Sequence, residues 1–249
     1  MIFKKIISNS SKRKGRVLYL MGATWHTKCM FDLDCDEDSF ADILYELGIE
    51  TYTFDNLPDS HKSNVELAIK LINDYNIDYI LGYSYGCITA CDVAQLTTIR
   101  GIMLLDPKSQ TKVNKTRVAD TFTLTKHDVD AALTKNSVAI SVAMHRAHID
   151  ALSQSDTFTV PVYPVDTIGE HSRFSDDLLG QSNLRLFLTG HSTKEVQHWN
   201  PAITTYYPDS SHWILLEKQR YALAQDVAQF ITTHKAPTDI NIPMSVNCQ

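Results

Sequence analysis

Short runs of β-branched and apolar residues alternate with helical stretches along most of this chain. The predicted strands span residues 16–21, 50–54, 77–81, 101–105, 184–188 and 203–207. The predicted helices, with apolar stripes near the 3.6-residue period, span residues 39–47, 63–75, 85–96 and 218–233. This alternation predicts an α/β fold with a mostly parallel sheet and helices on both of its faces.

Capping signals mark the ends of two of these helices. Gly48 follows the helix at 39–47, where a left-handed residue is favoured. Ser63 and Glu66 have the spacing of a capping box and predict that the next helix opens there and runs to about Tyr75. In the helix at 85–96, Cys87 and Cys91 lie four residues apart, so both are expected to face the core.

The alternation breaks between residues 108 and 181. We expect at least one helix there, roughly over 126–152, with two helices as the alternative, and interpret the segment as a cap or lid over the strand ends. Residues 1–107 and 182–235 then form the core, and residues 236–249, with two prolines, form an irregular tail. The basic segment Met1–Gly15 is expected to be a solvated arm.

Composition narrows the function classes. The 249 residues are 43% hydrophobic and 21% charged, which fits one domain with a sizeable core. The net charge of -6 argues against a general nucleic-acid binder, and the apolar runs are too short for a membrane span. Five cysteines and no secretory signal favour reduced thiols and a cytoplasmic protein. No cofactor is expected, and no metal, because His26 and Cys29 lack a second ligand pair.

The segment Gly82-Tyr83-Ser84-Tyr85-Gly86 matches Gly-x-Ser-x-Gly. This motif suits a sharp strand-to-helix turn that exposes a serine hydroxyl, and the predicted strand and helix stand on either side of it. The glycines remove Cβ atoms that would collide in so tight a turn. Ser84 is therefore the candidate nucleophile; the alternative is a glycine-rich turn with a structural serine.

A serine nucleophile needs a base within hydrogen-bond reach. His212 lies between the last predicted strand and the terminal helix, which places it at the same strand ends as Ser84 if the strands run parallel. His191 is a weaker rival. His145 and His148 are expected on a cap helix.

The order of strand, elbow, cap and late histidine resembles the α/β-hydrolase family over about Arg16 to Phe230. Ser211-His212-Trp213 is similar to the histidine loop of that family. The resemblance implies an acid carboxylate, an oxyanion hole and an acyl pocket. The backbone N–H groups of Tyr85 and Ala23 are the expected oxyanion donors, although Met21-Gly22-Ala23 stands where the family usually has His-Gly-x.

The acid that orients the histidine is harder to assign. The usual register of the family falls on Thr193, which cannot carry the charge, and Glu195 follows two residues later. The other position known in the family is the end of the strand after the nucleophile helix, where this chain has Asp106. We favour Asp106 and keep Glu195 as the alternative acid.

An activated serine with an oxyanion hole implies acyl transfer to water from an ester or a thioester. Four basic residues follow Asp106: Lys108, Lys112, Lys115 and Arg117. We favour a solvated loop for them; the alternative is a cationic entrance that attracts a phosphopantetheine-linked, carrier-bound acyl group. Thioesterase therefore stands beside carboxylesterase. The rival class is a non-catalytic ligand-binding protein on the same scaffold.

Overall fold

The computed structural model describes residues 2–7, 10–22, 36–55, 61–84, 86–105, 121–125, 130, 134, 140–152, 157–161, 185–189, 204–207, 210 and 213–233. The strands are β1 (Ile2–Lys5), β2 (Gly15–Leu20), β3 (Ile49–Phe54), β4 (Tyr79–Tyr83), β5 (Gly101–Leu105), β6 (Thr121–Thr125), β7 (Thr157–Pro161), β8 (Arg185–Thr189) and β9 (Thr204–Tyr206). The helices are the 3-10 turn η1 (Ser10–Lys12), α2 (Phe40–Glu46), α3 (His61–Tyr75), α4 (Gly86–Leu96), α6 (Val142–Leu152) and α9 (Arg220–Thr233).

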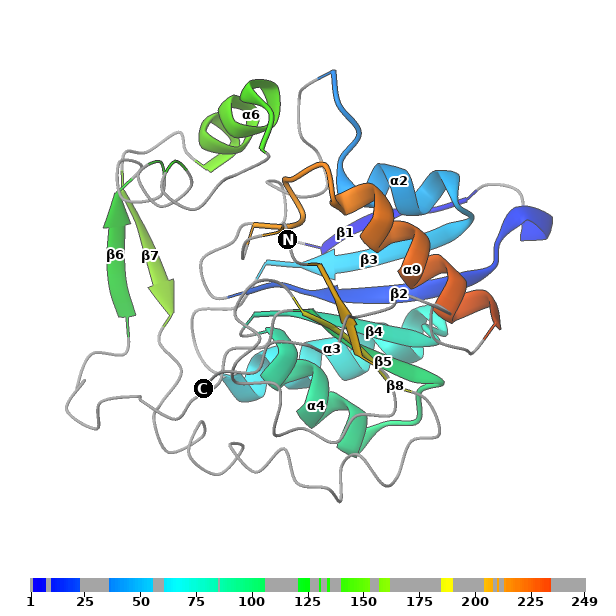
Figure 1. Ribbon diagram of the computed structural model, residues 1–249. Helices are drawn as coiled ribbons and strands as arrows, with labels where there is room; N and C mark the ends of the chain where they lie inside the picture. The colour runs from blue at the N-terminus through cyan, green and yellow to red at the C-terminus, as the bar shows by residue number, and fades with distance from the viewer. Residues whose placement is uncertain are drawn as a thin grey trace, which may run out of the picture.

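Within these ranges, seven strands form one sheet in the order β1-β3-β2-β4-β5-β8-β9 (Figure 1). Every neighbouring pair is parallel except β1 and β3, which are antiparallel. Helices α2 and α9 cover one face, and α3 and α4 cover the other (Figure 1). The predicted fold class, a mostly parallel sheet between two helical layers, is confirmed.

Alternating side chains divide the core into two halves. Val17 and Tyr19 of β2 belong to the apolar cluster built with α2 and α9. Leu18 and Leu20, the intervening residues, belong to the cluster built with α3 and α4. Because a parallel sheet is buried on both faces, its strands read as nearly continuous apolar runs, which is why the sequence revealed them so clearly.

The predicted helix ends hold for α2 and fail for α3. Ser39 caps α2 in a capping box with Asp42, and Gly48 has φ +90° just beyond its end, as expected. Helix α3 instead starts at His61, so Ser63 lies inside the helix and the predicted capping box is wrong. The physical reason is a tertiary contact, since His61 Nε2 lies 2.5 Å from Asp92 Oδ2 of α4 in a buried pair.

The N-terminal segment is part of the sheet, so the predicted solvated arm is wrong. Strand β1 pairs with β3, and Ile7 after it is buried. Lys5 forms an ion pair with Asp42 of α2, and the Lys4 ammonium lies over the Tyr75 ring. Long lysine stems cover apolar surface while their charges stay at the rim, so a basic sequence is compatible with an edge strand.

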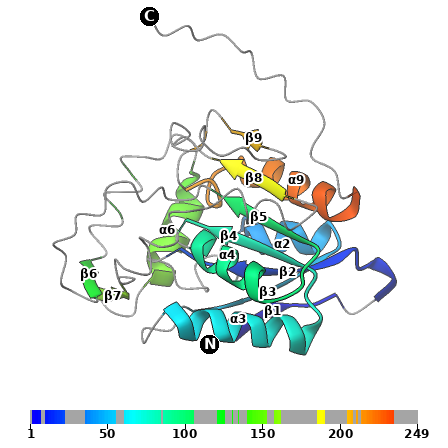
Figure 2. The ribbon, with the colours of Figure 1, turned by 90° about the horizontal axis from the view of Figure 1, so that it is seen from below.

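Between β5 and β8 the chain forms β6, α6 and β7, which lie outside the seven-stranded sheet. Figure 2 shows them on the side toward which β5 and β8 point. The expectation of at least one helix is confirmed by α6, which begins at Val142. Because Ile140 forms an antiparallel bridge with Glu217, a single helix does not fill residues 126–152, and two helices remain the alternative. The β6–β7 pair was not predicted.

The role of 108–181 as a cap stays a prediction, and the tail at 236–249 lies outside the described residues. Among the helices that the structure describes, none has the length and apolar character required to cross a bilayer.

Candidate active site

Ser84 occupies a sharp turn between β4, which ends at Tyr83, and α4, which begins at Gly86. Its φ of +54° lies in the left-handed region, which costs a residue with a Cβ roughly 1–2 kcal/mol. Two backbone bonds hold this conformation: Ser84 N donates to Leu105 O at 3.0 Å, and Cys87 N donates to Ser84 O at 3.1 Å. The turn has the strained strand-to-helix form expected for a Gly-x-Ser-x-Gly elbow.

Both glycines of the motif are required by packing. A Cβ on Gly82 would lie 2.7 Å from Gly86 O and 2.8 Å from Cys87 Cα. A Cβ on Gly86 would lie only 2.0 Å from Leu20 O at the end of β2. Because these neighbours are backbone atoms, they cannot move aside as a flexible side chain would. The spacing of the motif therefore follows from the close approach of β2, β4 and α4.

Ser84 and the described residues on either side of it are buried. The residue is 4% exposed, and Tyr83 and Cys87 on either side of the turn are fully buried. Cys91 is also buried, so the prediction that both α4 cysteines face the core is confirmed. The N-terminal end of α4 points its partial positive charge toward the turn, where it favours negative charge.

The end of β2 lies against the same turn, as the contact between Leu20 and Gly86 shows. Met21 and Gly22, which follow, are buried. Of the two predicted oxyanion donors, Ala23 follows Gly22 in the chain and Tyr85 follows Ser84. Both lie outside the described residues.

Asp106, Glu195 and His212 also lie outside the described residues, so the structure does not test whether they meet Ser84. Their flanking strands are described. Asp106 follows Leu105, the register partner of Tyr83 in the neighbouring strand. Glu195 follows β8, which is separated from β4 by β5.

Of the other histidines considered from the sequence, His145 lies on α6, with its Nε2 2.6 Å from Asp130 Oδ1. His148 is also in α6, and His191 lies outside the described residues.

No protein-family model and no curated protein sequence matches this chain. Solved structures do match. A monoacylglycerol lipase from Paleococcus ferrophilus aligns with a TM-score of 0.66 and 12% identity, over 94% of this chain and 100% of the other. Carboxylesterases of Nitrososphaera gargenis are represented by a structure with a TM-score of 0.57 and 10% identity, over 94% and 96%. The chain has the α/β-hydrolase fold.

A third similar structure is tomato Methylketone Synthase I complexed with beta-ketoheptanoate, with a TM-score of 0.61 and 10% identity over 87% of this chain and 98% of the other. At these identities the likeness is one of fold. In an α/β-hydrolase fold, the strand order places the serine turn at the carboxyl edge of the sheet, where ligands bind in open α/β sheets.

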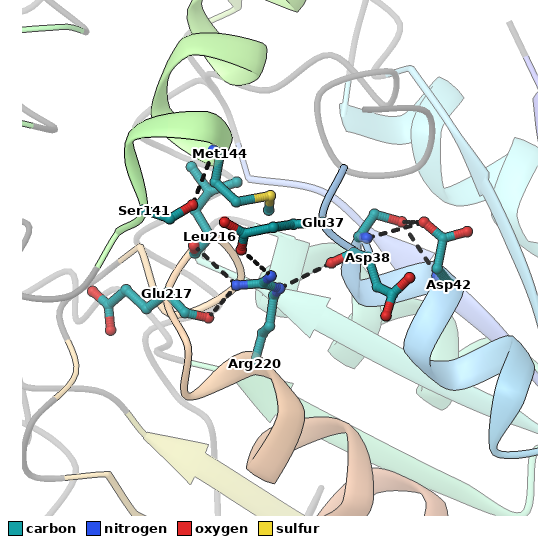
Figure 3. A network of polar contacts seen from close by, with 9 residues as sticks. Glu37, Asp38, Asp42, Ser141, Met144, Leu216, Glu217 and Arg220 are labelled. Carbon is teal, nitrogen blue, oxygen red and sulfur yellow. Dashed lines mark hydrogen bonds and ion pairs between the residues drawn. The ribbon is translucent and has the colours of Figure 1, made fainter. Parts of the chain in front are cut away.

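Arg220, which the sequence analysis did not single out, anchors the segment just after His212 (Figure 3). Its side chain is fully buried at the start of α9. Nη1 donates to Glu217 O at 3.0 Å and to Leu216 O at 3.4 Å, and Nε donates to Asp38 O at 3.0 Å. Nη2 donates to Glu37 Oε2 at 2.8 Å. One sequence signal was present: a cation at a helix N-terminus opposes the helix dipole and so needs another reason to be there.

Glu37 joins this arginine to α6. Hydrogen bonds from the Ser141 hydroxyl and then from Arg220 lower the pKa of Glu37 below its ordinary value. The Ser141 oxygen in turn accepts from Met144 N at 3.1 Å, which caps the first turn of α6 (Figure 3). The Met144 side chain is buried in the same apolar cluster as Leu216.

Proposed function

We propose that this chain is a serine hydrolase that cleaves a carboxylic ester or thioester through an acyl-enzyme on Ser84. The observation that carries the proposal is the left-handed conformation of Ser84 in a turn that tolerates only glycine at positions 82 and 86. Strain of this kind persists where the surrounding structure enforces it, and it clusters at active sites. A purely structural turn gains nothing from a serine at this φ, because glycine adopts it at lower cost.

His212 is the proposed general base. Strands β4, β5, β8 and β9 are mutually parallel, so the chain leaves β9 at the same end of the sheet at which β4 leads into Ser84. His212 would take the Ser84 hydroxyl proton as Oγ attacks the acyl carbon, and then give it to the leaving alcohol or thiol. Water, deprotonated by the same imidazole, would attack the acyl-enzyme, release the acid and restore the serine.

The proposed oxyanion hole is formed by the backbone N–H groups of Tyr85 and Ala23. The contact of Leu20 with Gly86 supports this pairing, because it brings the end of β2 beside the start of α4. The N-terminal end of α4 adds its favourable partial charge. Such donors stabilise the charge that develops on the acyl oxygen, and loss of one costs about 100- to 1,000-fold in rate.

Asp106 is the proposed acid, with Glu195 as the alternative. Leu105 lies beside Tyr83, so the chain leaves β5 next to the point where β4 leads into Ser84. A buried carboxylate there would orient the imidazole and stabilise its protonated form.

For the substrate, the similarity to a monoacylglycerol lipase and to carboxylesterases favours an ester of a carboxylic acid. The basic residues after Asp106 are the reason to include a carrier-bound thioester, whose phosphopantetheine arm carries a phosphate at the end remote from the acyl group. Both the carboxylic ester and the carrier-bound thioester are small acyl substrates that a cytoplasmic enzyme could meet.

The decisive experiment is labelling with a fluorophosphonate probe, together with turnover of a p-nitrophenyl ester series. The wild type should label and turn over esters. Ser84→Ala should abolish labelling, and Ser84→Ala and His212→Ala should each lower turnover by at least about a thousandfold. Ser11→Ala, in the exposed turn η1, is the matched control and should label normally.

Two results would reject the proposal. Labelling and turnover that survive Ser84→Ala would place the nucleophile elsewhere. A wild type that neither labels nor hydrolyses any ester or thioester, while still binding an acyl ligand, would identify a non-catalytic binding protein.

A further inference from the structure

The loop that carries His212 is short and has an anchored residue before it. Tyr207, directly after β9, is buried, and its hydroxyl donates to Asp226 Oδ2 of α9. Ser210 N donates to Tyr207 O at 3.1 Å, so the chain turns at once after this anchor. The position of residue 207 is therefore set by helix α9.

The residues after His212 are anchored on the same helix. Residues 213–217 form successive turns in which Leu216 N donates to Trp213 O at 2.8 Å and Glu217 N donates to Ile214 O at 3.2 Å. The side chains of Ile214, Leu215 and Leu216 are buried. The Arg220 guanidinium binds the carbonyl oxygens of Leu216 and Glu217, which closes these turns onto the first residue of α9.

Burying this guanidinium is costly. Moving a charge out of water costs several kcal/mol, and a buried ion pair is often no more stable than a well-packed apolar replacement. Among the residues that the structure describes, Arg220 pairs with one carboxylate, Glu37, and donates its other hydrogen bonds to three backbone carbonyl groups. Bonds to carbonyl groups fix the path of the main chain, which an apolar side chain cannot do.

We infer that Arg220 is a positioning residue for the general base: it holds the turns after His212 on α9, while the Tyr207–Asp226 bond holds the residue before the loop. This inference rests on the proposed function, because it assigns Arg220 a role only if His212 acts on Ser84. The hydrogen bonds of Arg220 within the described residues go to Glu37 and to backbone carbonyl groups, so the role that we infer is to position the loop.

The same arginine links this loop to α6. Glu37 accepts from both Arg220 and Ser141, and Ile140 forms a β-bridge with Glu217. The first turn of α6 and the turns after His212 therefore share one anchor. A change at Arg220 is expected to reach the loop from two sides, through its carbonyl contacts and through Glu37.

The test is Arg220→Lys, with Arg16→Lys as a matched control. Arg16 also pairs with a glutamate, Glu50, with Nε 2.8 Å from a carboxylate that is almost fully buried, but it lies at the opposite end of β2 from the serine turn. Lysine keeps the charge and loses the fork of donors in both variants. Both are expected to lower the melting temperature.

Only Arg220→Lys is expected to lower kcat for p-nitrophenyl esters, by about 100-fold with KM unchanged, because small misplacements of a catalytic group have effects of this size. The rate of fluorophosphonate labelling should fall in parallel. A wild-type kcat in Arg220→Lys, or equal loss of kcat in Arg16→Lys, would reduce Arg220 to a structural residue.

A milder pair covers the case in which Arg220→Lys does not fold. Tyr207→Phe removes the hydroxyl bond to Asp226, while Tyr79→Phe removes a hydroxyl bond to Ile231 O near the far end of the same helix. The inference expects kcat to fall in Tyr207→Phe and not in Tyr79→Phe; equal values in the two variants overturn it. Failure of the proposed function is separate, because it appears as activity that survives Ser84→Ala or as a wild type that neither labels nor hydrolyses esters.

Discussion

At the scale of single residues, the backbone is strained at Ser84, the residue that is proposed to carry the chemistry. Of the described residues, Asn76 and Ser84 are the two non-glycine ones with positive φ. Asn76 follows the last turn of α3, and asparagine tolerates this region well. Serine has no such advantage, so the conformation of Ser84 is imposed by β4, β5 and α4 around it.

Replacing Ser84 should expose this strain. Ser84→Gly is expected to be more stable than Ser84→Ala by about 1 kcal/mol, because glycine adopts positive φ without a Cβ penalty. Chemical denaturation of the two inactive variants measures the difference. At Ser63, inside α3, the order should reverse, since glycine is about 1 kcal/mol worse than alanine in a helix. The same order at both positions would contradict a left-handed Ser84.

At the scale of elements, α9 carries two carboxylate contacts with opposite pH behaviour. Burial raises the pKa of Asp226 above its ordinary value, and the hydrogen bond from Tyr207 opposes this only in part. Burial is also the main reason that the pKa of Tyr207 is raised. For Glu37, at the other contact, the hydrogen bonds from Ser141 and Arg220 lower the pKa.

These shifts predict opposite trends in stability. The folded state favours protonated Asp226, so this contribution is fully present below the ordinary pKa of 3.8 and is lost as the pH rises through the raised value. The melting temperature of the wild type should therefore fall relative to Asp226→Asn as the pH rises from 3.8 toward neutral.

Glu37→Gln provides the comparison with the opposite sign. The stabilisation from ionised Glu37 is present above its ordinary pKa of 4.5 and is lost as the pH falls through the lowered value. The wild type should therefore lose its advantage over Glu37→Gln on acidification. Melting curves of the three proteins between about pH 3 and pH 8 test both trends, and parallel curves would show that neither carboxylate titrates differently on folding.

How far the elements follow from the sequence depends on what determines them. Parallel strands and α2 were predictable because apolar runs and a local cap specify them. The start of α3 at His61 was not, since its partner Asp92 is distant in the sequence. Strand β1 was missed because its lysines read as solvated, although their stems pack at a sheet edge. Arg220 was missed because its partners come from 37–38 and 216–217, which no local pattern joins.

At the scale of the whole molecule, the order and direction of the strands determine which residues follow the strand ends beside Ser84. Ser84 and its two glycines were predictable, because a local motif defines them and the structure explains the motif. The acid was not, because Asp106 and Glu195 follow β5 and β8, two adjacent strands of one sheet, and both strands end at the same edge as β4. Spacing along the chain does not distinguish two such positions.

Paired substitutions should separate the two acids. If Asp106 orients His212, Asp106→Asn should lower kcat by about 10,000-fold, because an amide favours the wrong histidine tautomer, whereas Glu195→Gln should remain close to the wild type. Esterase assays on both variants, with melting curves to confirm folding, provide the measurement. A large loss of kcat in Glu195→Gln together with an almost unchanged kcat in Asp106→Asn would identify Glu195 as the acid.

The pairing of Lys5 with Thr51 has a consequence for synthesis of the chain. Strand β1 leaves the ribosome before β2, α2 and β3, so it stays without its partner strand until residue 54 has emerged. During that interval an uncharged strand would be free to adhere to other nascent chains. The neighbouring charges of Lys4 and Lys5 make such contacts repulsive. The same lysines that obscured this strand in the sequence therefore also disfavour its association with other chains before β3 is available.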